Sequence, residues 1–276
     1  MKRRSAKRII PGFGISLGLT TSFVSMMVLI PMLFLAVQSS DAGWSGFRKA
    51  LSDPRILAGY KVSFLCSFAA AGINSVFGLI LAWVLTRCRF PGHRLIDGLI
   101  ELPFALPTAV AGIALTALYS DKGWIGSFFA AAGIKIAYTG AGIIIAMTFI
   151  TLPFIVRTIQ PVLEQLDEAY EEAGRMFGAP RELIFRRIIL PELTPALLTG
   201  FGLAFARALG EYGSVVFIAG NMPFKTEIAP LLIMSKLEQF NYDESAAIAL
   251  VMLVVSFAVM FGINCVQSRA ASFSGG

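Results

Sequence analysis

Long runs without a single charged residue dominate this sequence. Each run exceeds or approaches the length of about 20 apolar residues that a helix needs to cross the roughly 30 Å hydrocarbon layer of a bilayer. A sixth apolar run contains only Arg207 and Glu211 as charged residues. The sequence therefore predicts an all-α membrane protein with six transmembrane helices, at about 15–37, 62–86, 102–120, 136–156, 194–222 and 245–268.

Composition agrees with a chain surrounded by lipid rather than water. Hydrophobic residues make up 56% of the sequence and charged residues only 14%, whereas a soluble domain carries roughly a quarter charged residues. The net charge of +6 does not indicate nucleic-acid binding, because the basic residues lie in short connectors and form no continuous stripe. Membrane lipid is therefore an expected partner, and nucleic acid is not.

The distribution of Lys and Arg predicts the orientation of the chain. Residues 1–14 form a basic segment, and the apolar run that follows is longer than the 7–15 residues of a signal peptide, so we expect it to remain as an anchor. With this end in the cytoplasm, 14 Lys and Arg residues lie inside and 8 outside. The sequence thus predicts a multi-pass membrane protein, with both termini and a short tail (269–276) in the cytoplasm.

The longest predicted cytoplasmic connector is residues 157–193, which lies within the six-helix transmembrane domain predicted over 15–268. We call it the coupling loop, because we expect it to meet a soluble partner. It holds many of the charged residues, as expected of a segment that meets a soluble partner. Pro180 suits the first turn of a helix, on which Glu182 and Arg186 would form an i, i+4 pair. Gly178 stands just before, where a tight turn between two helices is easiest.

The coupling loop resembles the EAA loop of the permease subunits of ABC importers. In that pattern Glu-Ala-Ala is followed after three residues by Gly and after nine more by Ile-x-Leu-Pro, and here only Gly174 departs, replacing the second alanine. The residues that fit the pattern are Glu172, Ala173, Gly178, Ile188, Leu190 and Pro191.

The resemblance implies a type I ABC importer permease fold. Its loop would form two short helices, separated at Gly178 and continuing through Ala179, that dock in a cleft of an ATPase subunit. The small residues Ala173 and Gly174 would permit close approach, and Pro191 would end the second helix. The alternative is an amphipathic helix that lies on lipid headgroups.

Two further runs, 104–112 and 208–228, are similar to the sulfate/thiosulfate permeases of the T type. The related molybdate permeases share shorter versions of both, so import of molybdate or tungstate is the alternative substrate class. The resemblance implies two ATPase subunits that use ATP and Mg, a periplasmic sulfate-binding protein, and a second permease of the W type. From the residues alone, the second permease is either a copy of this chain or a different one. The resemblance also implies a location in the bacterial inner membrane.

Four residues within the spans are candidates for the transport pathway or for helix pairing. Arg207 and Glu211 are four residues apart, and each would cost about 2.5–3.5 kcal/mol if unpaired at mid-membrane. We expect them to share a helix face, lying either along the anion path or between packed helices. Pro103 and Pro107 would either bend their span toward a cavity or serve packing alone.

Other classes of membrane protein fit the sequence less well. It contains no Gly-x-x-x-x-Gly-Lys-[Ser/Thr] phosphate loop, so we expect ATP hydrolysis in a separate subunit and no cofactor on this chain. A stand-alone secondary transporter would carry intramembrane carboxylates and a two-half repeat, neither of which is clear here. A membrane enzyme would need a cluster of His, Asp or Glu within the spans, and we identify no catalytic or metal-binding residue.

Overall fold

The computed structural model describes residues 13–41 and 43–274, and within these ranges the regular elements are all helical. Residues 1–12, most of the predicted basic segment 1–14, lie outside the described residues, as do 275–276 at the end of the predicted tail. In chain order the elements are α1 (Phe13–Asp41), α2 (Gly43–Ser52), α3 (Pro54–Arg87), α4 (His93–Ile100), α5 (Leu102–Ala105), α6 (Thr108–Tyr119), α7 (Gly126–Ala131), α8 (Gly140–Gln165), α9 (Glu168–Met176), α10 (Arg181–Ile184), the π-helical turn η1 (Phe185–Ile189), α11 (Leu190–Leu209), α12 (Val215–Ile218), α13 (Ala229–Glu238) and α14 (Tyr242–Ser274).

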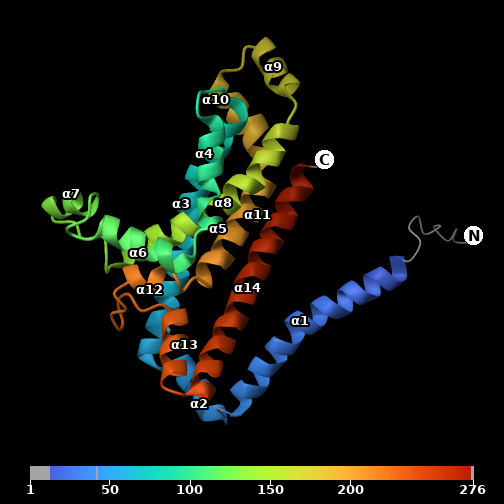
Figure 1. The fold of residues 1–276 in the computed structure, drawn as a ribbon. Coiled ribbons are helices and arrows are strands. Elements are labelled where there is room, and N and C mark those ends of the chain that lie inside the picture. Colours follow the sequence, from blue (N-terminus) through green and yellow to red (C-terminus); the bar gives the residue numbers. More distant parts are fainter. Residues whose placement is uncertain (1–12, 42, 275–276) are drawn as a thin grey trace, which may run out of the picture.

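Three long helices, α3, α8 and α11, pack side by side and form the centre of the molecule (Figure 1). Helix α14 packs against α11 and α13, whereas α1 contacts mainly α14 and α2 and then leads away from the bundle (Figure 1). The central helices lie close together because glycines of α3 and α11 face Ile155 of α8. A Cβ on Gly78 of α3 would come within 2.6 Å of Ile155 Cγ2, and one on Gly200 of α11 within 3.2 Å of Ile155 Cα. Small residues at such crossings let membrane helices approach.

Several connectors gather at two ends of the bundle, whereas α7 (Gly126–Ala131) projects from its side (Figure 1). Helices α9 and α10 lie at one end, α2 and α13 lie at the other, and α14 runs from the second end toward the first (Figure 1). The end of α3 lies beside α9, because Arg87 Nη2 is 3.4 Å from Glu171 Oε1. The segments to which the charge count assigns a cytoplasmic position, 87–94 and the coupling loop, therefore share one end. The direction in which the molecule faces stays a prediction.

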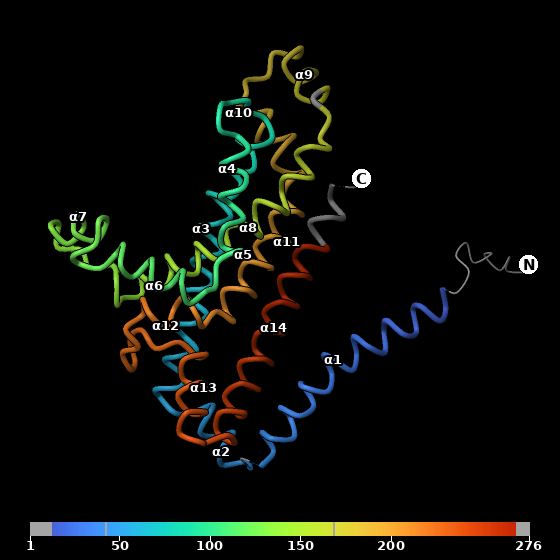
Figure 2. The backbone as a smooth tube through the Cα atoms, viewed as in Figure 1, coloured from blue at the N-terminus to red at the C-terminus, as the bar shows by residue number. Residues whose placement is uncertain are grey.

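Five helices are long and apolar enough to span a membrane, and four of them contain most or all of a predicted span. They are Phe13–Asp41, Pro54–Arg87, Gly140–Gln165, Arg181–Leu209 and Tyr242–Ser268. The predicted span 102–120 is instead broken: α5 ends at Ala105 and α6 begins at Thr108, after Leu106 and Pro107 in extended conformation. The tube in Figure 2 shows the chain changing direction between these helices. Short helices therefore occupy the place of the predicted third span, and the six-span count stays a prediction.

Several predicted boundaries differ from the structure; α3, for example, begins at Pro54 rather than at 62. The long helix that includes 194–209 begins at Arg181 and ends at Leu209, so 210–222 contains a turn and the short helix α12 rather than a continuous span. Helix α8 extends into the coupling loop as far as Gln165. Helix α14 continues through the tail to Ser274. Hydropathy measures how apolar a segment is, whereas the helix ends depend on caps and neighbours, which explains these shifts.

Candidate functional site

The coupling loop folds as two short helices joined by a glycine turn. Asp167 caps α9, its carboxylate accepting a hydrogen bond of 2.9 Å from the backbone N–H of Ala169. At the other end Gly178 has φ +75°, its N–H donates to Arg175 O (2.9 Å), and the N–H of Ala179 donates to Gly174 O (3.1 Å). This pair of bonds with a left-handed residue is a Schellman cap. The structure thus has the turn predicted at Gly178, and a local conformational reason for glycine there.

Gly174, the position that departs from the EAA pattern, lies where the two loop helices meet. A Cβ at Gly174 would be 3.1 Å from Ile184 Cγ1 and 3.2 Å from Ile184 Cδ1. Ile184 is buried at 4% exposure. The small residue therefore serves packing within the loop itself, whereas Ala173 is exposed.

Adjacent carboxylates in α9 have different surroundings. Glu171 is 14% exposed and pairs with Arg87 of α3 and with Arg175 of its own helix (3.2 Å). Arg87 Nη2 also donates to Leu166 O at 3.2 Å, so the end of α3 is tied to the start of the loop. Glu172, the glutamate of the motif, is exposed. The internal anchor is therefore Glu171, which sequence reasoning missed because the motif points to its neighbour.

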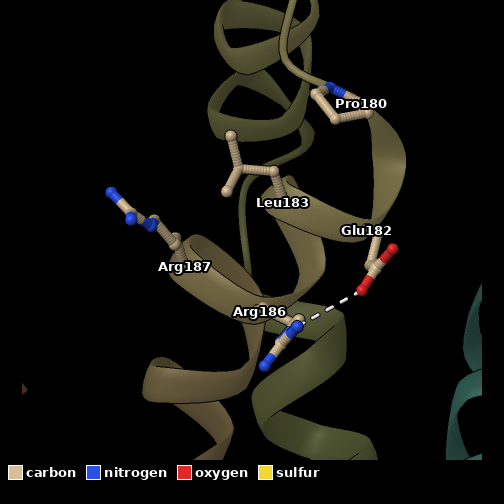
Figure 3. Close-up of a pocket in the computed structure, with 5 residues that line it drawn as sticks. All are labelled: Pro180, Glu182, Leu183, Arg186 and Arg187. Atoms are coloured by element: carbon tan, nitrogen blue, oxygen red, sulfur yellow. Dashed lines mark hydrogen bonds and ion pairs between the residues drawn. The ribbon is translucent and has the colours of Figure 1, made fainter.

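The tip of the loop exposes apolar side chains. Met176 is 88% exposed, Phe177 91% and Tyr170 61%, far more than the apolar residues of the packed helices beneath them. Exposed apolar side chains gathered in one short loop are typical of a protein interface or a membrane contact. Below the tip, a surface hollow is lined by residues from α10 and η1 (Figure 3). Figure 3 shows Glu182 and Arg186 pointing toward each other, 3.3 Å apart, as the sequence predicted. The lining residues are Pro180, Glu182, Leu183, Arg186 and Arg187.

The prediction that Pro191 ends the second loop helix was wrong. Pro191 lies in the first turn of α11, and the helical path from Arg181 to Leu209 continues through it. The turn immediately before it, Phe185–Ile189, is π-helical, and the N–H of Leu190 donates to Phe185 O. A π turn shifts the hydrogen-bond register, which lets a helix accommodate a proline that lacks its own N–H. Ile188 and Leu190 are half-buried on this continuous path, which joins the loop to the membrane helix without an interruption.

Arg207 and Glu211 form an ion pair, but not on one helix face as predicted. Helix α11 ends at Leu209, so Glu211 lies in the turn beyond it, and its carboxylate Oε2 is 2.5 Å from Arg207 Nη1. The second carboxylate oxygen of Glu211 accepts from the backbone N–H (2.9 Å) and hydroxyl (3.0 Å) of Ser214. Glu211 is fully buried, while the Arg207 side chain is 34% exposed. The pair therefore both closes the turn and leaves one side of the guanidinium accessible.

The segments singled out in the sequence as 104–112 and 208–228 pack against each other. A Cβ on Gly112 of α6 would lie 2.5 Å from Ser214 O and 2.8 Å from Ser214 Cα, so backbone meets backbone. A Cβ on Gly213 would lie 3.0 Å from Thr108 Cβ. Pro107, the N-cap residue of α6, starts the helix that makes this contact, and Pro103 is buried in α5. The broken helix and the turn that holds Arg207 and Glu211 are thus one packed unit.

Within the described ranges, no group of three or more His, Cys, Asp or Glu side chains could hold a metal ion. The contact of Gly112 with Ser214 could not be predicted from the sequence, in which Gly112 and Gly213 are the only hint of a close approach. Glu171 could have been found only by knowing that α3 ends beside α9.

The sequence matches a known family over residues 74–271, described as binding-protein-dependent transport system inner membrane component. It is 49% identical over 265 residues to the sulfate transport system permease protein CysT of Salmonella typhimurium, covering 96% of each chain. It is 48% identical to the protein of the same name in Escherichia coli over the same shares, and 47% identical to that of Synechocystis over 90% of this chain and 87% of the relative.

Solved structures of transporters have the same fold. A chain of a bacterial ABC transporter involved in the import of the acidic polysaccharide alginate superposes with a TM-score of 0.76, covering 94% of this chain and 96% of that one at 13% identity. A chain of the inward-facing MetNI methionine ABC transporter gives a TM-score of 0.59 at 17% identity, covering 78% and 95%.

Proposed function

Because the chain belongs to the family of binding-protein-dependent transport system inner membrane components, we propose that it is the permease subunit of an ATP-driven importer that carries sulfate or thiosulfate. The observation that carries this proposal is the 49% identity to a sulfate transport system permease protein over 96% of both chains. At that identity and coverage the relatives support the sulfate class over the molybdate and tungstate alternative.

The coupling loop is the proposed contact with the ATPase. Its exposed apolar tip, with Met176 and Phe177 almost fully accessible, is suited to a helix-in-groove contact with a soluble partner. Only Leu166 and Asp167 separate α8 from α9, and α10 leads directly through η1 into α11. A displacement of the loop would therefore reach two of the three central helices without passing through a flexible linker. We propose two such ATPase subunits, which use ATP and Mg.

The proposed passage lies beside the unit formed by α6 and the 210–214 turn. Irregular backbone at membrane depth is tolerated where it is buried in protein or lines a wet cavity. The backbone is irregular at Leu106 and Pro107, just before α6, and again in the turn that follows α11. Arg207 offers a partly accessible cation there, already neutralised by Glu211. One neutralised arginine is too little to hold a bare dianion tightly. We therefore propose that a periplasmic binding protein delivers the anion and that a second permease of the W type completes the passage.

Radiolabelled sulfate uptake by cells that carry the complete transport system tests the proposal. In a strain lacking its own sulfate permease, we expect this chain to restore uptake, and we expect unlabelled thiosulfate to compete more strongly than molybdate or tungstate. An uptake that molybdate suppresses at lower concentration than sulfate would move the chain to the other oxyanion class. Uptake that persists without any ATPase subunit would contradict the whole proposal.

A further inference from the structure

The guanidinium of Arg157 joins α8 to the junction between α4 and α5. Its Nη1 lies 2.7 Å from Asp97 Oδ1, and its Nη2 lies 2.7 Å from Glu101 Oε1 and donates to Asp97 O at 3.2 Å. The same Nη1 donates to Gln160 Oε1 (2.7 Å), one turn further along α8. We call the set of Arg157, Asp97, Glu101 and Gln160 the Arg157 clasp.

The clasp has the features of a preorganised connection. Gln160 is only 8% exposed, so it fixes the orientation of the arginine from within α8. Arginine presents its donors in a planar fork, which suits two carboxylates better than the single ammonium of lysine does. A second contact joins the same elements, because the rings of Phe104 in α5 and Phe154 in α8 meet edge to face at 5.2 Å.

The clasp lies between two parts of the molecule that transport must connect. Beyond Gln165, helix α8 leads directly into the coupling loop. In the other direction, the α4–α5 junction leads into α6, whose Gly112 abuts Ser214 in the turn that holds Glu211. At its start α4 is held to the end of α3, where His93 Nε2 lies 2.6 Å from Leu85 O. At its end it is held to α8 by the clasp.

We propose that Arg157 is a positioning residue for transport, which makes the α4–α5 junction move together with α8. A displacement of the coupling loop then reaches α6 and the Arg207 turn through the clasp, and not only through α11. This role rests on the proposed function, since it gives the proposed coupling loop a second route to the proposed passage.

Removal of the arginine has two separable effects. Arg157→Gln removes the guanidinium that joins α8 to the α4–α5 junction. It also leaves Asp97 and Glu101 as two neighbouring carboxylates that repel each other. The triple variant Arg157→Gln, Asp97→Asn, Glu101→Gln removes the repulsion but does not restore the fork. Arg157→Lys keeps the charge without the planar geometry. A swap, Arg157→Asp with Asp97→Arg, can rebuild an ion pair across the same junction.

The first experiment measures sulfate uptake and ATP hydrolysis by the complete transporter at matched amounts in the membrane. We expect Arg157→Gln to lower uptake by about tenfold or more while ATP hydrolysis falls less. We expect the triple variant to accumulate normally yet transport poorly, Arg157→Lys to be intermediate, and the swap to recover part of the uptake. Lys135→Gln is the matched control, because Lys135 forms an exposed pair with Asp121 away from the clasp. Normal uptake by Arg157→Gln, or full recovery in the triple variant, would overturn the proposal.

The second experiment does not depend on sulfate. Spin labels at the exposed positions Leu99 in α4 and Glu164 in α8, after replacement of the exposed Cys88 and Cys265, report the distance between the two elements in lipid nanodiscs. We expect a narrow distance distribution in the wild type and the swap, and a broad one in Arg157→Gln and the triple variant. Equal widths in all four would overturn the clasp. A wild-type transporter that shows the narrow distribution but imports no sulfate would instead contradict the proposed function alone.

Discussion

At the scale of single residues, we expect Glu171 and Glu172 of α9 to have different roles: Glu171 stabilises the loop, and Glu172 contacts the partner. Glu171 is 14% exposed and pairs with Arg87 and Arg175, whereas Glu172 is exposed. We expect Glu171→Gln to destabilise the isolated permease by about 1–3 kcal/mol, the range for hydrogen bonds to charged groups. Glu172→Gln should leave its stability unchanged and weaken binding of the ATPase subunit. Thermal unfolding of the permease alone and co-purification of the complex measure the two effects, and equal loss of stability in both variants would contradict this division.

Gly178 offers a second test at the residue scale. Its φ of +75° costs a β-branched residue about 1–2 kcal/mol, while a Cβ there meets no atom of residues 13–41 or 43–274 within 4 Å. Gly178→Val should therefore reach the membrane in near-normal amount, bind the ATPase subunit weakly and fail to support uptake. Gly178→Asn is the matched control, since asparagine tolerates the left-handed region and should retain most of the uptake. Normal uptake by Gly178→Val at matched expression would remove the glycine turn from the mechanism.

At the scale of elements, the contact between α6 and the 213–214 turn leaves no room for a side chain. An added Cβ at Gly112 would lie 2.5 Å from Ser214 O, and a backbone atom cannot move aside as a side-chain tip can. We expect Gly112→Ala to cost about 1–3 kcal/mol, as overpacking does, and to lower uptake because the Arg207 turn is displaced. Gly72→Ala in α3 is the control: a Cβ there meets nothing within 4 Å, and alanine is the better helix former. Thermal unfolding of both variants gives the comparison, and equal stability would show that the contact can relax.

The π turn before Pro191 is the second feature at this scale. Because η1 lets the path from Arg181 to Leu209 remain helical, the second helix of the coupling loop, α10, is continuous with α11. In a sequence, a proline that follows a predicted short helix indicates the end of that helix, because proline lacks an N–H and clashes with the preceding turn. The alternative is a local change of hydrogen-bond register. In the structure it occurs where the ring of Phe185 packs edge to face on Trp83 at 5.7 Å, a contact that sequence spacing does not reveal.

At the scale of the whole molecule, the orientation in the membrane is the central prediction. Cysteines placed at Ala179 and Ser274 should react only with reagents that reach the cytoplasm, as should one at Ser5, while those at Ser45 and Ser127 should react from outside. The expectation follows from the 14 to 8 distribution of Lys and Arg. The exposed Cys88 and Cys265 must first be replaced, since either would give a background signal. Labelling of a cysteine at position 179 from outside would show that the orientation is the opposite one. The coupling loop could then not meet a cytoplasmic ATPase.

The sequence by itself determined the features that depend on composition and local conformation. The length of the uncharged runs was enough to predict an all-α membrane protein, because lipid leaves few options for unpaired backbone groups. Gly178 was predicted as a turn because the left-handed cap is a property of a few consecutive residues. Tertiary structure decided which neighbours meet: that Glu171 rather than Glu172 anchors the loop, that Gly112 meets Ser214, and that Arg157 joins α8 to the broken helix. These contacts join residues from about 55 to about 100 positions apart in the chain. They depend on how helices pack, which local periodicity does not encode.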